Sequence, residues 1–266
     1  MDLKVTKERF SEHWTYDWIK YLAFVIAAIL FVNLLFSVTA RKLTDKEELR
    51  IVVYSKYISN MTAYETKDDL RDYILDLNLT DSEYLDNEYG FYNYGNSIEE
   101  KNAAKAKVEA DQMMDIIDVL LLPLISDKDY FDDEGNIVEF GLSFEYLAGV
   151  GFYIPLDELI DNECEKNNPA ALELKNLLET HPEYFYCCKR VTPNSDMTDI
   201  HVHDETIRPY GINLNGLNSA KVNAFIHEVD IVTGNEESLY AMGVRKECQS
   251  HAESVAFLNW FIKNYA

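Results

Sequence analysis

The feature that most constrains this chain is an uninterrupted apolar run from Tyr21 to Val38, which contains no charged residue and no proline. At roughly 1.5 Å of rise per helical residue, a helix over this run is about 27 Å long, enough to cross the hydrocarbon core of a bilayer. We therefore expect a single transmembrane helix over residues 21–39, with the lipid bilayer as its partner. The chain that follows would then be a domain held at a membrane surface.

A secretory signal peptide is the alternative interpretation of this run. The small residues of Val38-Thr39-Ala40 would suit cleavage, but the apolar run is longer than the about 7 to 15 residues of a usual signal core. The preceding twenty residues carry four basic and four acidic side chains and several aromatic residues, which are typical of a membrane interface. This pattern favours an uncleaved anchor, preceded by a short amphipathic tail over residues 1–20.

The orientation of the span is nearly balanced by the positive-inside rule, which counts basic residues on both flanks. Lys20 and the basic residues before it compete with Arg41, Lys42 and Lys46 after the span. We expect the tail to be cytoplasmic, because it is short and the large domain resembles a secreted one. Residues 40–48 are then a linker and residues 49–266 an extracytoplasmic domain. The protein would be a single-pass protein of the cell membrane.

The part of the chain after the span is strongly acidic. The formal net charge is −23, from 24 basic and 47 acidic residues, and the first twenty residues contribute nothing to this excess. Such a surface repels the phosphates of nucleic acids and of anionic lipids, which argues against nucleic-acid binding. The hydrophobic fraction of 47% is sufficient for a packed core. The sequence has no Gly-rich phosphate loop and no CxxC pattern, and we expect no cofactor.

Strands and helices alternate through the first half of the domain. β-branched and aromatic residues predict the strands, and the last strand is an apolar run of the kind buried on both faces of a parallel sheet. The helices have cap-like residues at their start, Thr66 in the first and Ser97 in the second. In order, the predicted elements are strand 49–57, helix 66–77, strand 84–94, helix 97–114 and strand 116–123. This alternation predicts an α/β domain.

The second half of the domain predicts shorter elements. Apolar spacing and turn residues indicate helices at 144–148, 154–160, 169–179 and 247–265, strands at 181–190, 200–203 and 210–214, and a helix or strand pair over 218–232.

Three segments in this chain resemble a known family. They are Ala110 to Pro123 (ADQMMDIIDVLLLP), Tyr146 to Ile160 (YLAGVGFYIPLDELI) and Ser254 to Ile262 (SVAFLNWFI). In this order they are similar to segments of the extracellular solute-binding proteins of bacterial ABC importers. The resemblance implies a periplasmic-binding-like, two-lobed α/β fold that binds a small polar solute and serves an ABC transporter permease. The chain is short for two full lobes, so we expect the second lobe to be reduced.

Candidate ligand-binding residues follow from where open α/β sheets bind ligands, at the carboxyl ends of their parallel strands. Tyr54, Tyr57, Tyr92 and Tyr94 lie near the carboxyl ends of the first two predicted strands, and aromatic faces suit a polar solute in a cleft. Tyrosines that simply pack in the strands are the alternative interpretation. Arg208 could hold a carboxylate or sulfate, or could pair with one of the many surface acids.

His201 and His203 are weak candidates for a metal site. Histidines two apart on a strand point to the same face, and an acid could complete the ligand set. Surface histidines without a metal are the simpler interpretation, so we predict no metal site. The sequence has no HExxH motif and no Gly-x-Ser-x-Gly elbow, and we expect no enzyme activity.

Two functions remain open. One is a membrane-anchored solute-binding-like protein for an ABC-type transporter. The other is a non-catalytic interaction or accessory module, built on the same scaffold without a functional ligand cleft.

Overall fold

The computed structural model describes residues 7–39, 48–55, 66–79, 85–93, 98–113, 116–124, 142–193, 200–218, 221–222 and 239–266. The chain divides into two compact units, Met1–Leu43 and Thr44–Ala266. Each unit is described by itself.

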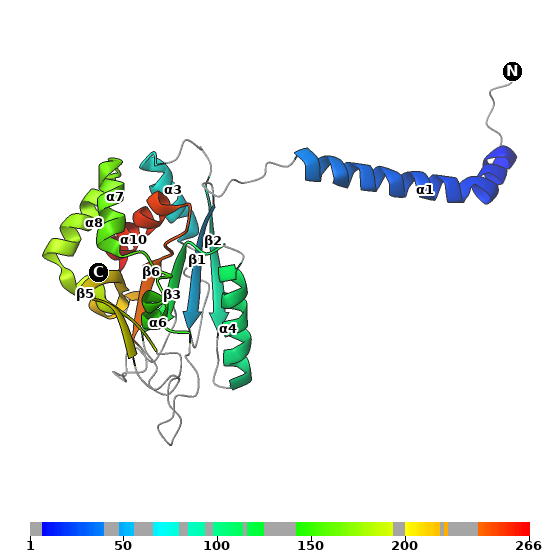
Figure 1. Ribbon diagram of the computed structural model, residues 1–266. Coiled ribbons are helices and arrows are strands. Elements are labelled where there is room, and N and C mark those ends of the chain that lie inside the picture. Colours follow the sequence, from blue (N-terminus) through cyan, green and yellow to red (C-terminus); the bar gives the residue numbers. More distant parts are fainter. Residues whose placement is uncertain are drawn as a thin grey trace. The chain divides into compact units, whose positions relative to one another are not determined.

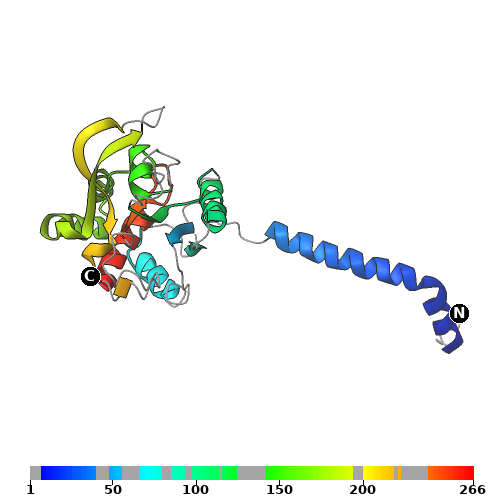
Figure 2. The same cartoon turned by 90° about the horizontal axis from the view of Figure 1, so that it is seen from below.

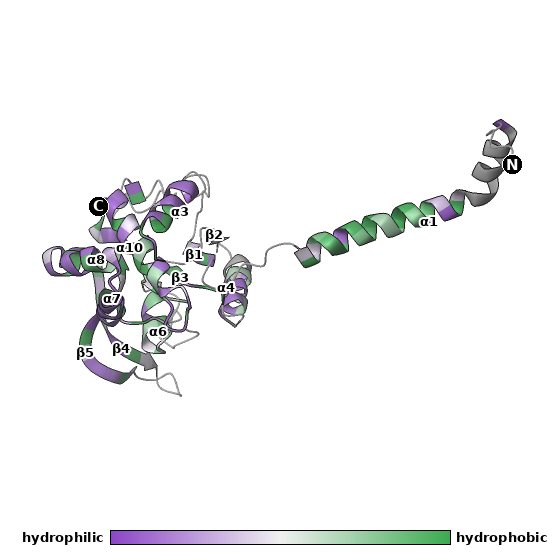
Figure 3. Ribbon diagram, turned by 90° about the horizontal axis from the view of Figure 1, so that it is seen from above, coloured by the Kyte–Doolittle hydropathy of each residue, from purple (hydrophilic) through white to green (hydrophobic). Residues whose placement is uncertain are grey.

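The first unit contains one helix, α1 (Lys7–Thr39), and its segment Trp18–Thr39 is long and apolar enough to cross a membrane. None of this 22-residue segment is buried, and its large apolar side chains are between 44% and 75% exposed. Figure 3 shows it as a nearly continuous hydrophobic helix. The predicted helix over 21–39 is confirmed as a helix, and it starts earlier than the apolar run, at Lys7.

The second unit is built around one mixed sheet of six strands (Figure 1). The strands are β1 (Glu48–Ser55), β2 (Asp86–Asn93), β3 (Val119–Pro123), β4 (Phe185–Pro193), β5 (Ile200–Asn213) and β6 (Tyr240–Val244). Their order across the sheet is β2-β1-β3-β6-β5-β4. The first three strands are parallel to one another, whereas β6, β5 and β4 pair antiparallel.

Helices cover both faces of this sheet, because β1 and β3 are apolar at successive positions. Ile51 and Val53 of β1 point into a core with α3 (Lys67–Asp76), α7 (Leu156–Glu165), α8 (Pro169–Thr180) and α10 (His251–Tyr265). Val52 and Tyr54 point the opposite way, toward α4 (Ile98–Met113) and α6 (Phe144–Gly149). The end-on view in Figure 2 shows helices on both sides of the strands. The α/β class predicted from the sequence is confirmed.

Two glycines let the rings of Phe144 and Tyr153 lie directly on the sheet. These rings stack with their centroids 4.5 Å apart. A Cβ on Gly211 would lie 2.5 Å from the Phe144 ring, and one on Gly243 would lie 2.7 Å from the Tyr153 ring. Larger residues would therefore push the rings off the sheet.

The antiparallel half of the sheet differs from the sequence-based expectation. The two predicted strands 200–203 and 210–214 form one strand, β5, because it pairs with β4 along most of its length through several register shifts. Such β-bulges allow a ribbon to twist and to include a proline, here Pro209. The strand β6 was not predicted, although it is fully buried and pairs with β3 and β5.

Local details at helix and strand ends also differ. Thr66 is at the N-cap of α3, but its side chain makes no capping hydrogen bond, since its backbone is already in the α-region. The predicted strand 181–190 begins with a short 3-10 helix, Pro182–Tyr184. Another, Leu214–Gly216, ends β5. The closing helix starts at His251 rather than at residue 247.

Several expectations fall partly or wholly outside the described residues. They include the cap at Ser97 and nearly all of the predicted segment 218–232. The described part of residues 44–266 forms one sheet in one compact unit. A reduced second lobe therefore stays a prediction.

Candidate functional site

Of the predicted ligand-site tyrosines, the two that the structure describes pack or form a hydrogen bond within the domain. Tyr54 and Tyr92 are neighbours across β1 and β2. The Tyr54 side chain is 6% exposed and belongs to the core. The half-buried Tyr92 donates its hydroxyl hydrogen to the Asp111 carboxylate on α4. Burial, aided by Asp111, raises the pKa of Tyr92 to about 12. Tyr57 and Tyr94 lie outside the described residues.

Arg208 is held by two acids at the start of α7. Its Nε lies 3.0 Å from one oxygen of Asp157 and its Nη2 lies 2.9 Å from the other. Glu158 adds weaker contacts at 3.5 Å. This is the two-pronged geometry that guanidinium and carboxylate groups favour, and it raises the pKa of Arg208 through the Asp157 hydrogen bonds. Arg208 thus joins β5 to α7. This is the alternative considered from the sequence, in which Arg208 pairs with a surface acid.

His201 and His203 share one face of β5, as predicted from their spacing. Their ring centroids are 4.6 Å apart in an edge-to-face arrangement, and both side chains are exposed. Nε2 of His203 lies 2.7 Å from the Thr192 hydroxyl on β4. Within the described ranges, no group of three or more His, Cys, Asp or Glu side chains could hold a metal ion. The two histidines are therefore a pair without a third ligand in that part of the chain.

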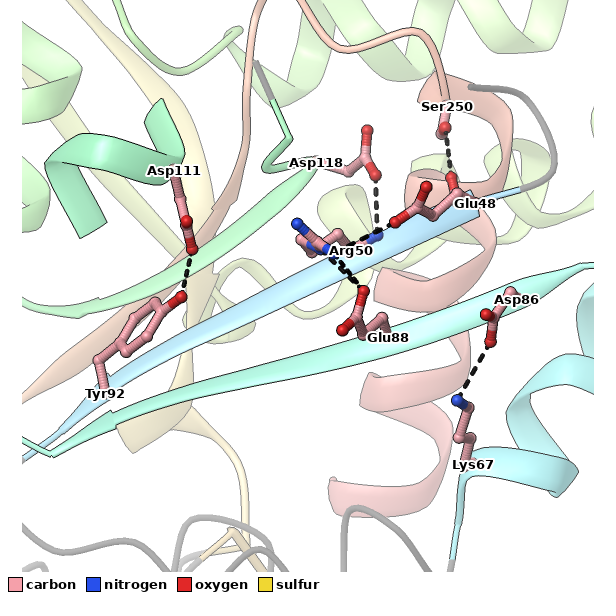
Figure 4. Close-up of polar contacts among 9 residues, drawn as sticks. All are labelled: Glu48, Arg50, Lys67, Asp86, Glu88, Tyr92, Asp111, Asp118 and Ser250. Carbon is pink, nitrogen blue, oxygen red and sulfur yellow. Dashed lines mark hydrogen bonds and ion pairs between the residues drawn. The ribbon is translucent and has the colours of Figure 1, made fainter. Parts of the chain in front are cut away.

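A polar cluster that the sequence did not predict lies at the amino ends of the three parallel strands (Figure 4). We call Glu48, Arg50, Glu88 and Asp118 the amino-edge cluster. The Arg50 guanidinium pairs with Glu88 on β2 and lies 3.4 Å from Glu48. The backbone N–H of Arg50 donates to the Asp118 carboxylate at 2.8 Å. The cluster therefore joins β1, β2 and the residue before β3.

Asp118 is the member of this cluster with the most perturbed titration. Burial, together with the negative charge of Glu48, raises the pKa of the Asp118 carboxyl to about 6, against the opposing effects of the Arg50 N–H and of Arg245 and Arg50. A carboxyl group with such a pKa gains and loses its proton near neutral pH. The pattern that could have revealed it is an acid directly before a fully buried apolar strand.

The same end of the sheet is tied to the region between β6 and α10. The backbone N–H of Arg245 donates to the carbonyl of Asp118 at 2.9 Å, and the Ser250 hydroxyl donates to the carbonyl of Glu48 at 2.9 Å. Burial raises the pKa of the nearby Cys248 thiol to about 12, with a further contribution from Asp118. The thiol is therefore protonated at neutral pH and is a poor nucleophile. This arrangement serves to hold the sheet and α10 together.

A shallow hollow of about 320 Å³ lies beside α10, with a mixed polar and aromatic lining. Trp260 and Tyr265 form its buried aromatic part. The exposed Lys221 Nζ donates to the main-chain oxygen of Ala266 at 3.1 Å. The lining residues are Thr66, Asp69, Lys221, Trp260, Asn264 and Tyr265. None of the sequence-predicted ligand residues is among them.

Comparison with known proteins gives no relative: no family model, no curated protein and no solved structure matches this chain. The resemblance to solute-binding proteins therefore stays a prediction.

Proposed function

We propose that this protein is a membrane-anchored accessory module whose acidic α/β domain contacts a membrane protein on the extracytoplasmic side. The observation that carries the membrane part is the Trp18–Thr39 helix, whose apolar side chains are all exposed in the chain by itself. An exposed apolar surface of this extent is costly in water and favourable in hydrocarbon.

The state of the candidate ligand residues supports an accessory role rather than solute capture. Tyr54 is packed in the core, Tyr92 is bonded to Asp111, and Arg208 is held by Asp157. A solute would have to displace these partners before it could use the same groups. The domain's excess negative charge favours a partner with a basic surface. A permease of the ABC type is the partner that the resemblance implies.

Solute binding is the second candidate, and one observation favours it. Strands β2, β1 and β3 form an open parallel half-sheet joined through α3 and α4, and the carboxyl edge of such a sheet is where α/β proteins bind ligands. On this proposal the ligand is a small polar solute.

Cross-linking in intact membranes tests the first proposal. Cells would express the full chain or, as a control, residues 1–43 fused to an unrelated soluble domain. We expect a membrane protein that is cross-linked to the full chain and not to the control. Equal cross-linking of both would show that the domain contributes nothing and would refute the accessory role.

A thermal-shift measurement separates the two candidates. The full chain in detergent micelles would be heated with sugars, amino acids, peptides or metal ions. A ligand present at 100 times its dissociation constant adds about 2.7 kcal/mol to the free energy of unfolding. Stabilisation by a solute would favour solute binding, and no shift with any solute is the result expected for the accessory module. Protease added to intact cells checks the orientation, since the proposal requires that it digest the domain.

A further inference from the structure

Asn33 is a polar residue inside the apolar part of α1. It lies fifteen residues after Trp18 and six before Thr39, the ends of the segment long enough to cross a membrane. At 1.5 Å per residue, it is roughly 9 Å from the Thr39 end, which places it within the hydrocarbon if the helix spans a bilayer. Its carboxamide has two N–H donors and an acceptor oxygen, and water is not available there to satisfy them.

The other polar side chains near this end of the helix are satisfied within it. The Ser37 hydroxyl donates to the carbonyl of Leu34 at 2.9 Å, and the Thr39 hydroxyl donates to the carbonyl of Leu35 at 2.6 Å. Within the described part of the chain, the exposed Asn33 carboxamide makes no hydrogen bond of this kind. Its hydrogen-bonding capacity is therefore left for another molecule.

The residues that share a face with Asn33 follow a heptad pattern. Counting back from Phe36 in alternating steps of three and four residues gives the seam Phe36, Asn33, Ile29, Ile26, Leu22 and Ile19. The apolar members of this seam are between 48% and 70% exposed. Asn33 occupies the position equivalent to Ile19 and Ile26, and Leu22, Ile29 and Phe36 occupy the intervening positions, so a single Asn interrupts an otherwise apolar seam. In two-stranded helical pairs, one such Asn fixes the register and the number of strands.

We propose that the Trp18–Thr39 helix pairs with the same helix of a second copy of this chain, with the two Asn33 carboxamides hydrogen-bonded to each other. The proposal rests on the membrane anchoring proposed above. Two copies inserted in the same direction are parallel, so a two-fold axis along the pair brings Asn33 opposite Asn33. Each carboxamide then donates to the oxygen of the other. A second copy is the occupant because one carboxamide complements another and the heptad seam repeats on both helices.

Energy transfer between labelled full chains in lipid vesicles tests the proposal. Donor- and acceptor-tagged copies would be reconstituted at a series of protein-to-lipid ratios to obtain a dissociation constant. We expect Asn33→Leu to weaken pairing roughly 3- to 30-fold, the range found for hydrogen bonds between helices in membranes. Asn33→Gln keeps a carboxamide at the same position and should retain most of the pairing.

Ala27→Leu provides the matched control. Ala23 and Ala27 form a small-residue face, the other common basis of helix pairing, and Ala27 lies outside the proposed seam. We expect this variant to pair as the wild type does. The proposal would be overturned if Ala27→Leu lost pairing while Asn33→Leu paired as the wild type does. It would also be overturned by a wild-type chain that stays monomeric at every protein-to-lipid ratio.

Alkaline carbonate extraction of the same vesicles separates this proposal from the anchoring on which it rests. If the wild-type chain is extracted, the anchoring itself is wrong and the pairing proposal fails with it. If wild type and variants all resist extraction and energy transfer is equal in wild type and Asn33→Leu, only the pairing proposal is overturned.

Discussion

Replacing Asp118 with Asn tests how the amino-edge cluster responds to pH. Burial raises the pKa of the Asp118 carboxyl from 3.8 to about 6 in the folded protein. The folded state therefore binds the proton more tightly than the unfolded state. As the pH rises from about 4 to about 6, the folded state holds more protons than the unfolded state, and the free energy of unfolding falls.

The size of this effect follows from the pKa difference. A separation of about 2 units corresponds to about 3 kcal/mol at 1.36 kcal/mol per unit. This is an upper value, because Asp118 keeps some exposure to solvent. This loss of stability is absent below the pKa that Asp118 has in the unfolded state, where the group is protonated in both states. It is fully present above the folded pKa, where the carboxylate is charged in both states.

Asn keeps an oxygen that can accept the Arg50 N–H but cannot ionise. We therefore expect Asp118→Asn to match the wild type near pH 4 and to be more stable by up to about 3 kcal/mol near pH 8. Urea unfolding of residues 44–266 at several pH values measures this difference. The informative quantity is the difference in the free energy of unfolding between wild type and Asp118→Asn at each pH, since the many other acids are common to both proteins.

Asp72→Asn is the matched control, because Asp72 is an exposed carboxylate on α3. Replacing this exposed side chain removes no buried charge, so Asp72→Asn should not reproduce the stabilisation expected of Asp118→Asn at pH 8. A difference between wild type and Asp118→Asn that is constant from pH 4 to pH 8 would refute the burial argument. So would a variant that is less stable than the wild type at pH 8.

Two further substitutions test packing and pairing. Gly211→Ala should lower the free energy of unfolding by about 1–3 kcal/mol, because the new Cβ would lie 2.5 Å from the Phe144 ring and 2.7 Å from a main-chain oxygen; an unchanged urea midpoint would contradict this. Arg208→Gln removes a partly exposed ion pair with Asp157 and should cost less than about 1 kcal/mol. Loss of a solute-dependent thermal shift in this second variant would instead assign Arg208 to ligand binding.

The two inner strands of the parallel half, β1 and β3, were predictable because they are buried on both faces. The residues Ile51 to Tyr54 of β1 and all of β3 therefore form continuous apolar runs. Short-range pattern is sufficient for such elements. The prediction of strand 116–123 failed only at its start, where Asp118 precedes β3.

The antiparallel half was harder to predict because local pattern and final environment disagree. β6 contains Ala241, Met242 and Gly243, which have lower strand propensity than β-branched residues. It is a strand because it lies between β3 and β5 and every residue is buried. In β5, charged residues interrupt the apolar pattern, but a ribbon with exposed side chains tolerates them.

The candidate site was the least predictable part, because its contacts join residues far apart in sequence. Arg208 and Asp157 are 51 positions apart, and Arg50 and Asp118 are 68 apart. In a chain with 47 acidic residues, the sequence cannot show which acid meets which arginine. The sequence did show the shared face of His201 and His203, since alternation along a strand is a local property.

The negative charge of the domain opposes the proposed pairing of two copies, whereas the Trp18–Thr39 helix favours it. Two domains that share an excess of negative charge repel each other when their helices pair. At physiological ionic strength, salt largely screens the repulsion between exposed charges that are more than about 8 Å apart. We therefore expect pairing of the full chain to tighten as salt rises from about 0.05 to 0.5 M, as measured by energy transfer in vesicles of neutral lipid. Residues 1–43 with a neutral fused domain should show little change. Pairing that weakens with salt would mean that ion pairs between the domains hold the copies together, and the Asn33 seam would no longer account for the dimer.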